Sequence, residues 1–148
     1  MSGVCVNSMY KNFTLKITVF HCINTFNDAM TMPWGEDEEV KINFIKLPCS
    51  SMVKDVFLLR AFEAGADAVI VMVCPEGACR YVEGNIRAKR RVLWVQKVLD
   101  EIGLGGRRLT IFNVAPGDEN AIVKIIEEIR ADVAALGPSP AHYVARLA

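Results

Sequence analysis

The chain has 148 residues, enough for one domain with a substantial core. Its 17 basic and 17 acidic residues balance, which argues against non-specific nucleic-acid binding because such binding needs a basic excess. Hydrophobic residues make up 52% of the chain, so we expect a sheet buried on both faces or a surface partly covered by partners.

Residues 1–13 have no clear hydrophobic period and are predicted to form an N-terminal arm. They contain no continuous apolar stretch, which makes them a poor signal peptide. No apolar run in the chain approaches the ~18–20 residues of a membrane span. The sequence therefore predicts a cytoplasmic protein, and five cysteines in such a chain favour metal or redox chemistry over structural disulfides.

A single domain is predicted over residues 14–136, and it begins with two strands. Alternating, β-rich residues predict a strand over 15–21, which ends at Cys22. A loop is predicted over 23–39, and a second strand over 40–47. Cys49 follows the second strand almost at once.

A helix is predicted next, with Ser50 and Ser51 as its N-cap and Gly65 beyond its end. The apolar positions of this helix are Val53, Val56, Phe57, Leu59 and Phe62. An unbroken apolar run over 68–73 then predicts a buried strand, and a tight turn follows over 74–79.

The second half of the domain is predicted to hold a long helix over 80–102, a strand over 109–114 and a last helix. The predicted inward positions of the long helix are Ala88, Val92, Val95, Leu99 and Ile102. Those of the last helix are Ile122, Ile125, Ile126, Ile129 and Val133. Residues 137–148 form a short tail after a Gly-Pro break.

Strands that alternate with helices predict an α/β fold, a flavodoxin-like or Rossmann-like parallel sheet of about four strands. Ligands in such sheets collect beyond the carboxyl ends of the strands. Cys22, Cys49 and Cys74 each follow a different strand, and Cys79 lies one turn beyond Cys74. With the strand order 2-1-3-4, the four thiols are expected to converge.

Four convergent thiols suit several kinds of site. A [2Fe–2S] cluster takes four thiolates, and C-x4-C spacing recurs in its ligand sets. Structural zinc also takes four thiolates but typically uses two close pairs, whereas this chain has one. A [4Fe–4S] cluster lacks its usual C-x2-C-x2-C run here. Buried cysteines that pack only as small apolar side chains are the remaining alternative.

A phosphate-binding loop is a rival interpretation of the turn, because Cys74 and Arg80 form C-x5-R between a strand and a helix. Such a loop aims successive backbone N–H groups at the anion. Pro75 removes one of these donors and Glu76 adds a negative charge, so both argue against a cysteine phosphatase or an arsenate reductase. Tyr81 also stands where a Ser or Thr would be expected.

Two further features are candidates for function. His21 precedes Cys22 and is a reserve ligand of the kind found in Rieske-type sites, although a simple hydrogen-bonding role is commoner for such a histidine. The long helix carries a basic stripe with Trp94, and the alternatives are a solvated face and a docking face. The basic residues of this stripe are Arg87, Lys89, Arg90, Arg91 and Lys97.

Four motifs together resemble the delta subunit of methyl-viologen-reducing hydrogenase. They are Pro48-Cys49-Ser50-Ser51, Leu59-Arg60-Ala61-Phe62-Glu63-Ala64-Gly65-Ala66-Asp67, Cys74-Pro75-Glu76-Gly77-Ala78-Cys79-Arg80-Tyr81 and Gly84-Asn85-Ile86-Arg87-Ala88-Lys89-Arg90-Arg91. The resemblance covers roughly residues 15–136. It implies an α/β domain with one [2Fe–2S] cluster and, for this chain, Cys22, Cys49, Cys74 and Cys79 as metal ligands.

The resemblance also implies an electron relay without independent catalysis. Such a protein passes electrons between an input oxidoreductase and a flavin-containing heterodisulfide-reductase-like subunit. Hydrogenase, formate dehydrogenase, methylenetetrahydrofolate reductase and, in anaerobes, benzoyl-CoA reductase complexes are the input types. The family's first loop often has a C-C-x-x-C pattern, whereas this chain has only Cys22 there, and Cys5 lies outside the resemblance.

Overall fold

A computed structural model describes residues 14–25, 39–78 and 83–141. Its strands are β1 (Leu15–Cys22), β2 (Val40–Leu47), β3 (Ala68–Val73) and β4 (Leu109–Asn113). Its α-helices are α2 (Asp55–Glu63), α3 (Gly84–Glu101) and α4 (Glu119–Leu136), and the 3-10 helices η1 (Ser50–Met52) and η2 (Gly106–Arg108) precede α2 and β4.

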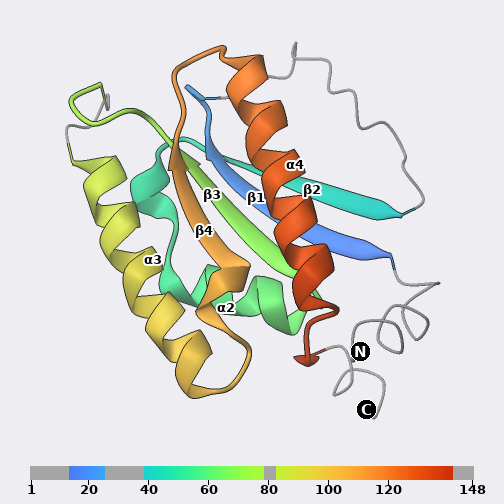
Figure 1. The fold of residues 1–148 in the computed structure, drawn as a ribbon. Coiled ribbons are helices and arrows are strands. Elements are labelled where there is room, and N and C mark those ends of the chain that lie inside the picture. The colour runs from blue at the N-terminus through green and yellow to red at the C-terminus, as the bar shows by residue number, and fades with distance from the viewer. Residues whose placement is uncertain (1–13, 26–38, 79–82, 142–148) are drawn as a thin grey trace.

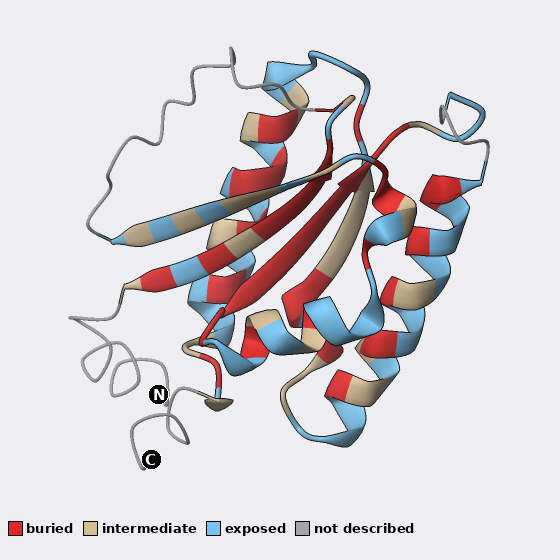
Figure 2. Cartoon of the chain, turned by 180° about the vertical axis from the view of Figure 1, so that it is seen from behind, coloured by how far each residue is buried: buried red, intermediate tan, exposed pale blue. Residues whose placement is uncertain are grey.

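The four strands form one parallel sheet in the order β2-β1-β3-β4. The predicted fold class and strand order are therefore confirmed. Figure 1 shows α4 lying across one face of the sheet, and Figure 2, seen from behind, shows α2 and α3 on the other face. This arrangement brings the carboxyl ends of all four strands to one edge.

The hydrophobic core has two parts, one on each face of the sheet. Phe20, Val69 and Val71 pack with α2 and α3, whereas their neighbours Val19 and Ile70 pack with α4. Every residue of β3 is buried because this strand is central and has helices over both faces. The inward positions predicted for α4 are all buried, and this prediction is confirmed.

Four details of the predicted helices are wrong. α2 begins at Asp55 rather than after Ser50 and Ser51, because those two residues lie in η1. Val53 is buried but lies before α2, so it does not mark the buried face of the helix; Leu58 and Phe62 do, while Val56 and Phe57 are exposed. α3 begins at Gly84 instead of residue 80. Ile102, predicted to face inward, caps that helix with 60% of its surface exposed.

A buried arginine connects the C-terminal end of α4 to the edge of the sheet at which the strands begin. The Arg108 guanidinium donates hydrogen bonds to the carbonyl oxygens of Asp67 (3.1 Å) and Gly137 (2.9 Å). The Asp67 carboxylate accepts from the backbone N–H groups of Ser139 (2.8 Å) and Lys16 (2.9 Å). The first residues of the predicted tail are therefore packed against the domain.

Within the described part of the chain, no helix combines the length and the apolar character needed to cross a bilayer.

Candidate metal centre

Three of the four predicted ligands lie at the carboxyl edge of the sheet. Cys22 is the last residue of β1, Cys49 follows β2 after Pro48, and Cys74 directly follows β3. All three are buried and none forms a disulfide. Cys79 lies outside the described residues, so its position is not tested. The three described cysteines therefore lie at the edge that the topology predicted, while the convergence of all four thiols on one site stays a prediction.

Cys22 and Cys74 bring their sulfur atoms together. The two Sγ atoms are 3.7 Å apart, although 52 residues separate the cysteines in sequence. Two thiolates bound at about 2.3 Å to one tetrahedral metal ion are roughly 3.8 Å apart. The pair therefore has the spacing of two ligands of one ion, while in this structure the Cys74 thiol donates a hydrogen bond to the Cys22 sulfur.

Cys49 is held by a different set of interactions. Its Sγ accepts hydrogen bonds from the backbone N–H (3.4 Å) and the hydroxyl (3.2 Å) of Ser51, and so caps η1. Arg91 of α3 donates to the carbonyl oxygens of Ser51 and Val53 (2.9 Å). The turn that carries Cys49 is therefore held both by hydrogen bonds to the Cys49 sulfur and by hydrogen bonds from Arg91 of α3.

The turn after Cys74 is held by two asparagines. Asn85 Nδ2 lies 3.1 Å from the carbonyl oxygens of both Cys74 and Pro75, and Asn113 Nδ2 donates to Cys74 at 2.9 Å. The turn itself is closed by the Ala78 N–H, which donates to Pro75 at 3.0 Å. The backbone of Cys74 is therefore anchored to both α3 and β4.

Cys22 also sits in a closed turn. Its carbonyl oxygen accepts hydrogen bonds from Thr25, from the hydroxyl at 2.7 Å and the backbone N–H at 2.9 Å. His21 is buried, with its Nδ1 3.3 Å from the same carbonyl and its ring edge-on to Phe44. Because neighbouring strand residues point to opposite faces, His21 faces the α4 side with Phe44, away from Phe20 and Cys22.

A hollow of about 590 Å³ lies beside Cys49. Its wall includes Ser51, Met52, Gly84 and Arg87. Met52 is 49% exposed, although it is only three residues from the buried Cys49. The hollow therefore gives a short path from the surface to the Cys49 turn.

Among residues 14–25, 39–78 and 83–141, no group of three or more His, Cys, Asp or Glu side chains is gathered as in a preformed metal site. The described thiols supply the Cys22–Cys74 pair and the separately capped Cys49. For the phosphate-loop alternative, Arg80 lies outside the described residues. Glu76 is exposed and lies 3.9 Å from Lys89 of α3.

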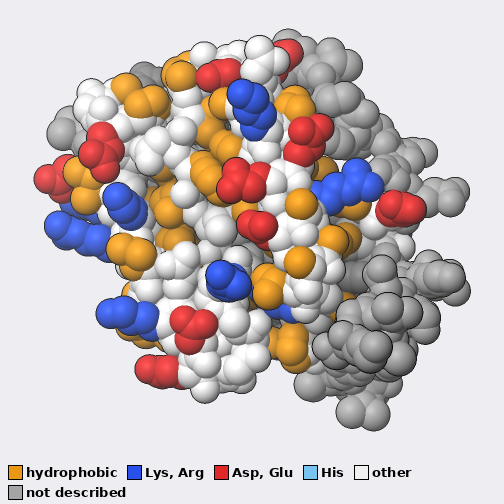
Figure 3. All heavy atoms as spheres, in the orientation of Figure 1, with side chains coloured by type: hydrophobic (Ala, Val, Ile, Leu, Met, Phe, Trp, Pro, Cys, Tyr) orange, Lys and Arg blue, Asp and Glu red, His pale blue; other side chains and the backbone are white. Residues whose placement is uncertain are grey.

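Apart from Lys89, which lies near Glu76, the basic stripe of α3 divides into two groups. Arg91 is half-buried and serves the Cys49 turn, and Arg87 pairs with Glu83 at 3.7 Å across one helical turn. A separate outward row, here called the α3 face, consists of Ile86, Arg90, Leu93, Trp94 and Lys97. Leu93 and Trp94 are each at least half exposed, which is unusual for such large apolar side chains. In Figure 3, Lys and Arg side chains follow the α3 edge at the left, among acidic and hydrophobic ones.

Sequence reasoning missed the side chains that fix the cysteine-bearing turns. Asn85 and Asn113 reach Cys74 from 11 and 39 residues away, and Arg91 reaches Ser51 from 40 residues away. Local patterns carry no signal for such distant pairs. The one local signal is Ser51, because a Ser two residues after a turn cysteine can donate to its sulfur.

The fold and the site together define a flavodoxin-like α/β domain with buried thiols at the carboxyl edge of its sheet. Residues 17–137 match the family model described as methyl-viologen-reducing hydrogenase, delta subunit. The chain belongs to this family.

Curated relatives carry related names. The iron-sulfur subunit of the vhu F420-non-reducing hydrogenase of Methanocaldococcus jannaschii is 37% identical over 99 residues, covering 67% of this chain and 74% of the relative. The corresponding iron-sulfur subunit of the vhc hydrogenase of Methanococcus voltae is 31% identical over 133 residues, covering 88% of this chain and 92% of the relative.

A third relative is a much longer protein. It is one polypeptide of the ferredoxin/F420H2-dependent CoB-CoM heterodisulfide reductase of Methanosarcina acetivorans, 33% identical over 97 residues. The match covers 66% of this chain but only 12% of that polypeptide. A domain similar to this chain is therefore part of a heterodisulfide reductase protein.

Proposed function

We propose that this chain is an electron-transfer subunit that holds one [2Fe–2S] cluster through Cys22, Cys49, Cys74 and Cys79. The observation that carries the proposal is the Cys22–Cys74 pair, with 3.7 Å between buried, unoxidised sulfurs at the edge where α/β sheets place their ligands. Family membership supports iron rather than zinc, because the related hydrogenase proteins are named iron-sulfur subunits.

The partners we propose are an input oxidoreductase and a flavin-containing heterodisulfide-reductase-like subunit. The relatives that belong to hydrogenases support a hydrogenase-type input. The relative that contains a similar domain within a heterodisulfide reductase polypeptide supports an output of that type. We propose that the chain catalyses nothing alone and conducts electrons between the two.

The side chains of this protein would do three things for such a cluster, which when bound takes up and releases one electron. Burial of Cys22, Cys49 and Cys74 keeps water from their sulfurs. The two donors of Ser51 place partial positive charge against the Cys49 sulfur, which stabilises added negative charge. Asn85 and Asn113 hold the Cys74 turn fixed, so that little reorganisation is needed when the charge changes.

The proposal is tested on protein purified without oxygen. We expect iron and acid-labile sulfide in equal amounts, with visible absorbance and a paramagnetic signal on reduction. Serine replacements of Cys22, Cys49, Cys74 and Cys79 should each lower the bound iron, because each removes one thiolate. Cys5→Ser is the matched control and should keep the full amount.

Other results would assign the site differently. One zinc and no iron would make it a structural zinc centre. Turnover of a phosphate ester that is lost in Cys74→Ser would support the phosphatase alternative. Rapid oxidation or reduction of a small organic substrate by the isolated chain would contradict the relay.

A further inference from the structure

A second recess, here called the β2 groove, lies between α2 and the half of the sheet formed by β1 and β2. It has a volume of about 600 Å³. Figure 2 shows that no described helix covers β2 on this side, because α2 is short and lies away from that strand. Asn43 of β2 is exposed in the groove, and Ile45 and Leu47 are only half-buried.

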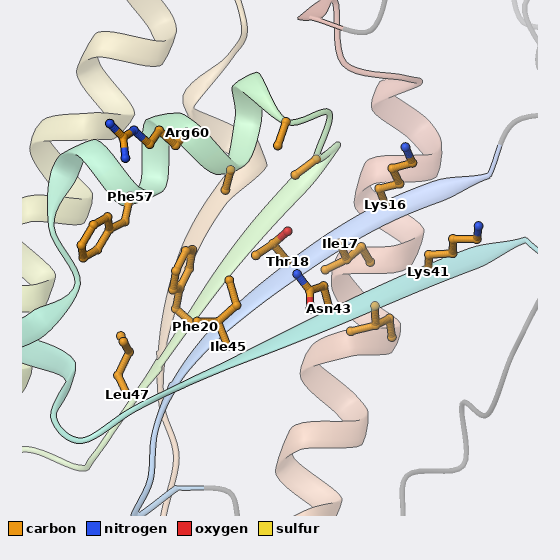
Figure 4. Close-up of a pocket in the computed structure, with 14 residues that line it drawn as sticks. Lys16, Ile17, Thr18, Phe20, Lys41, Asn43, Ile45, Leu47, Phe57 and Arg60 are labelled. Carbon is orange, nitrogen blue, oxygen red and sulfur yellow. The ribbon is translucent and has the colours of Figure 1, made fainter.

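The β2 groove has an apolar end and a cationic end. In Figure 4, Phe20, Ile45, Leu47 and Phe57 lie together at one end of it. At the other end Lys16 and Lys41 lie side by side on neighbouring strands. Arg60 of α2 adds a third cation to the rim, and Phe57 beside it is 38% exposed.

The charge of the β2 groove is one-sided. The described residues that line it include Lys16, Lys41 and Arg60 but no carboxylate, although acidic and basic residues balance over the whole chain. Lys16 and Lys41 are direct register partners on adjacent strands, and like charges in that position repel each other. Neither lysine forms an ion pair with a described carboxylate. A bound carboxylate would relieve this repulsion.

We propose that the β2 groove docks an acidic, amphipathic segment of a partner subunit. Apolar side chains of the segment would cover Phe20, Ile45 and Leu47, and its carboxylates would lie over Lys16 and Lys41. The inference rests on the proposed function only in assuming that partner subunits exist. It adds which surface one of them uses and what chemistry that partner segment must have.

The dimensions of the groove suit a single element of secondary structure. From Lys41 to Leu47 the strand advances six residues, or about 20 Å at roughly 3.3 Å each. That length is spanned by about four turns of α-helix. Leu47 is two residues before Cys49, so a segment seated here ends close to the candidate metal centre.

A second copy of this chain fits the groove less well than an acidic partner. In a two-fold contact each copy would present its own Lys16, Lys41 and Arg60 to the same cations of the other. The described residues that line the groove include no acidic counterpart to offset that repulsion. A small amphipathic anion, such as a fatty acid, is another ligand that would match an apolar end and a cationic end. The competition experiment below distinguishes it from a segment of a partner subunit.

The first test is photo-crosslinking in the intact complex. A benzophenone amino acid at Asn43 should crosslink to a segment of another subunit that contains several Asp or Glu residues beside apolar ones. The same amino acid at Lys124, exposed on α4, is the control and should not label that segment. Labelling of this chain alone, labelling of a segment without carboxylates, or no label at Asn43 would overturn the proposal.

The second test uses the charges. Lys16→Glu with Lys41→Glu should weaken partner binding about tenfold at low ionic strength, and the difference from the unaltered chain should shrink as salt rises. Lys124→Glu is the matched control and should bind as the unaltered chain does. A charge-reversed pair that binds normally would overturn the proposal, as would displacement of the partner by no more than an equimolar amount of a long-chain fatty acid.

These outcomes are separable from a failure of the electron-transfer proposal. The charge-reversed pair should keep its full iron and sulfide content, because the groove contains no cysteine among its described lining residues. Normal partner binding by a charge-reversed pair with an intact cluster would contradict the groove alone. An unaltered chain that holds no iron would contradict the cluster alone.

Discussion

Individual side chains around the cysteines do two separate jobs, one on the backbone and one on the sulfur. Thr25, Asn85 and Asn113 donate to the carbonyl oxygens of Cys22 and Cys74, which positions these residues without touching their sulfurs. Ser51 is different because both of its donors point to the Cys49 sulfur itself. Its effect should therefore be electronic as well as structural.

Ser51→Ala should lower the reduction potential of the bound cluster. The change removes the hydroxyl donor at 3.2 Å and keeps the backbone donor at 3.4 Å, so the reduced, more negative state loses part of its stabilisation. A shift of a few tens of millivolts, on the order of 1 kcal/mol, is expected for one lost hydrogen bond to a charged group. A redox titration followed by the paramagnetic signal measures it.

Ser51→Thr is the conservative control because it keeps a hydroxyl at the same position. Its potential should stay near that of the unaltered protein, and both variants should bind the same amount of iron. An unchanged potential in Ser51→Ala would show that the hydroxyl does not act on the sulfur.

The positions of the cysteines at strand ends are predictable from sequence, whereas the side chains that hold them are not. Alternating and continuous apolar runs locate β1, β2 and β3, and the order of a parallel sheet then places Cys22, Cys49 and Cys74 at one edge. Contacts such as that of Arg91 with Ser51 depend on how α3 packs beside η1, and local sequence contains no record of that packing. For the same reason the sequence alone groups Arg91 with the exposed basic stripe.

At the scale of elements, the start predicted for α2 is wrong, and so are two of the residues predicted to face inward from it. Ser50 and Ser51 have the residue types of an N-cap, but the Cys49 sulfur caps a short 3-10 helix there and α2 starts only at Asp55. Phe57 is exposed beside the β2 groove instead of lying in the core. The groove could not be predicted from sequence, because it depends on this exposure and on the shortness of α2.

The contacts that hold the start of β4, the end of α4 and the start of β1 together depend on Arg108. Burial lowers the pKa of this guanidinium, and the negative charge of Asp67 opposes the shift. The group still stays protonated at neutral pH, because the ordinary pKa of arginine is so high. Its hydrogen bonds to Leu104, Asp67 and Gly137 then connect three segments that are distant in sequence.

Arg108→Met should destabilise the fold by about 3 kcal/mol. The variant removes the guanidinium donors from the buried carbonyl oxygens of Asp67 and Gly137, and this loss outweighs the gain from an apolar side chain. Urea unfolding followed by circular dichroism measures the change. Arg107→Met is the neighbouring control, and because Arg107 is exposed its effect should stay within about 0.5 kcal/mol. Equal effects of the two changes would contradict this role.

For the whole molecule, an electron relay needs one surface for a donor and another for an acceptor. Helices α2 and α3 lie on the same face of the sheet (Figure 2), and the β2 groove borders α2 on that face. The α3 face presents Trp94 with 53% of its surface exposed, beside Leu93 and Arg90. Trp and Arg are the residues most enriched among those that dominate interface energetics. The hollow at Cys49 adjoins the first turn of α3 through Gly84 and Arg87.

Trp94→Ala combined with Arg90→Glu should weaken the binding of a partner subunit by roughly 30-fold, about 2 kcal/mol, because it removes an exposed aromatic anchor and reverses a neighbouring charge. Native mass spectrometry or sedimentation of the complex measures the loss, and the cluster's spectrum should not change.

Leu136→Ala with Lys124→Glu on α4 is the matched control, since it removes an exposed apolar side chain and reverses a charge on the other face of the sheet. Arg91 is left intact, because changing it would disturb the Cys49 turn and mix two effects. If the α3 variant loses one partner and the groove variant loses the other, the two surfaces serve different subunits. Assembly of the α3 variant at the strength of the α4 control would rule out the α3 face as a docking surface.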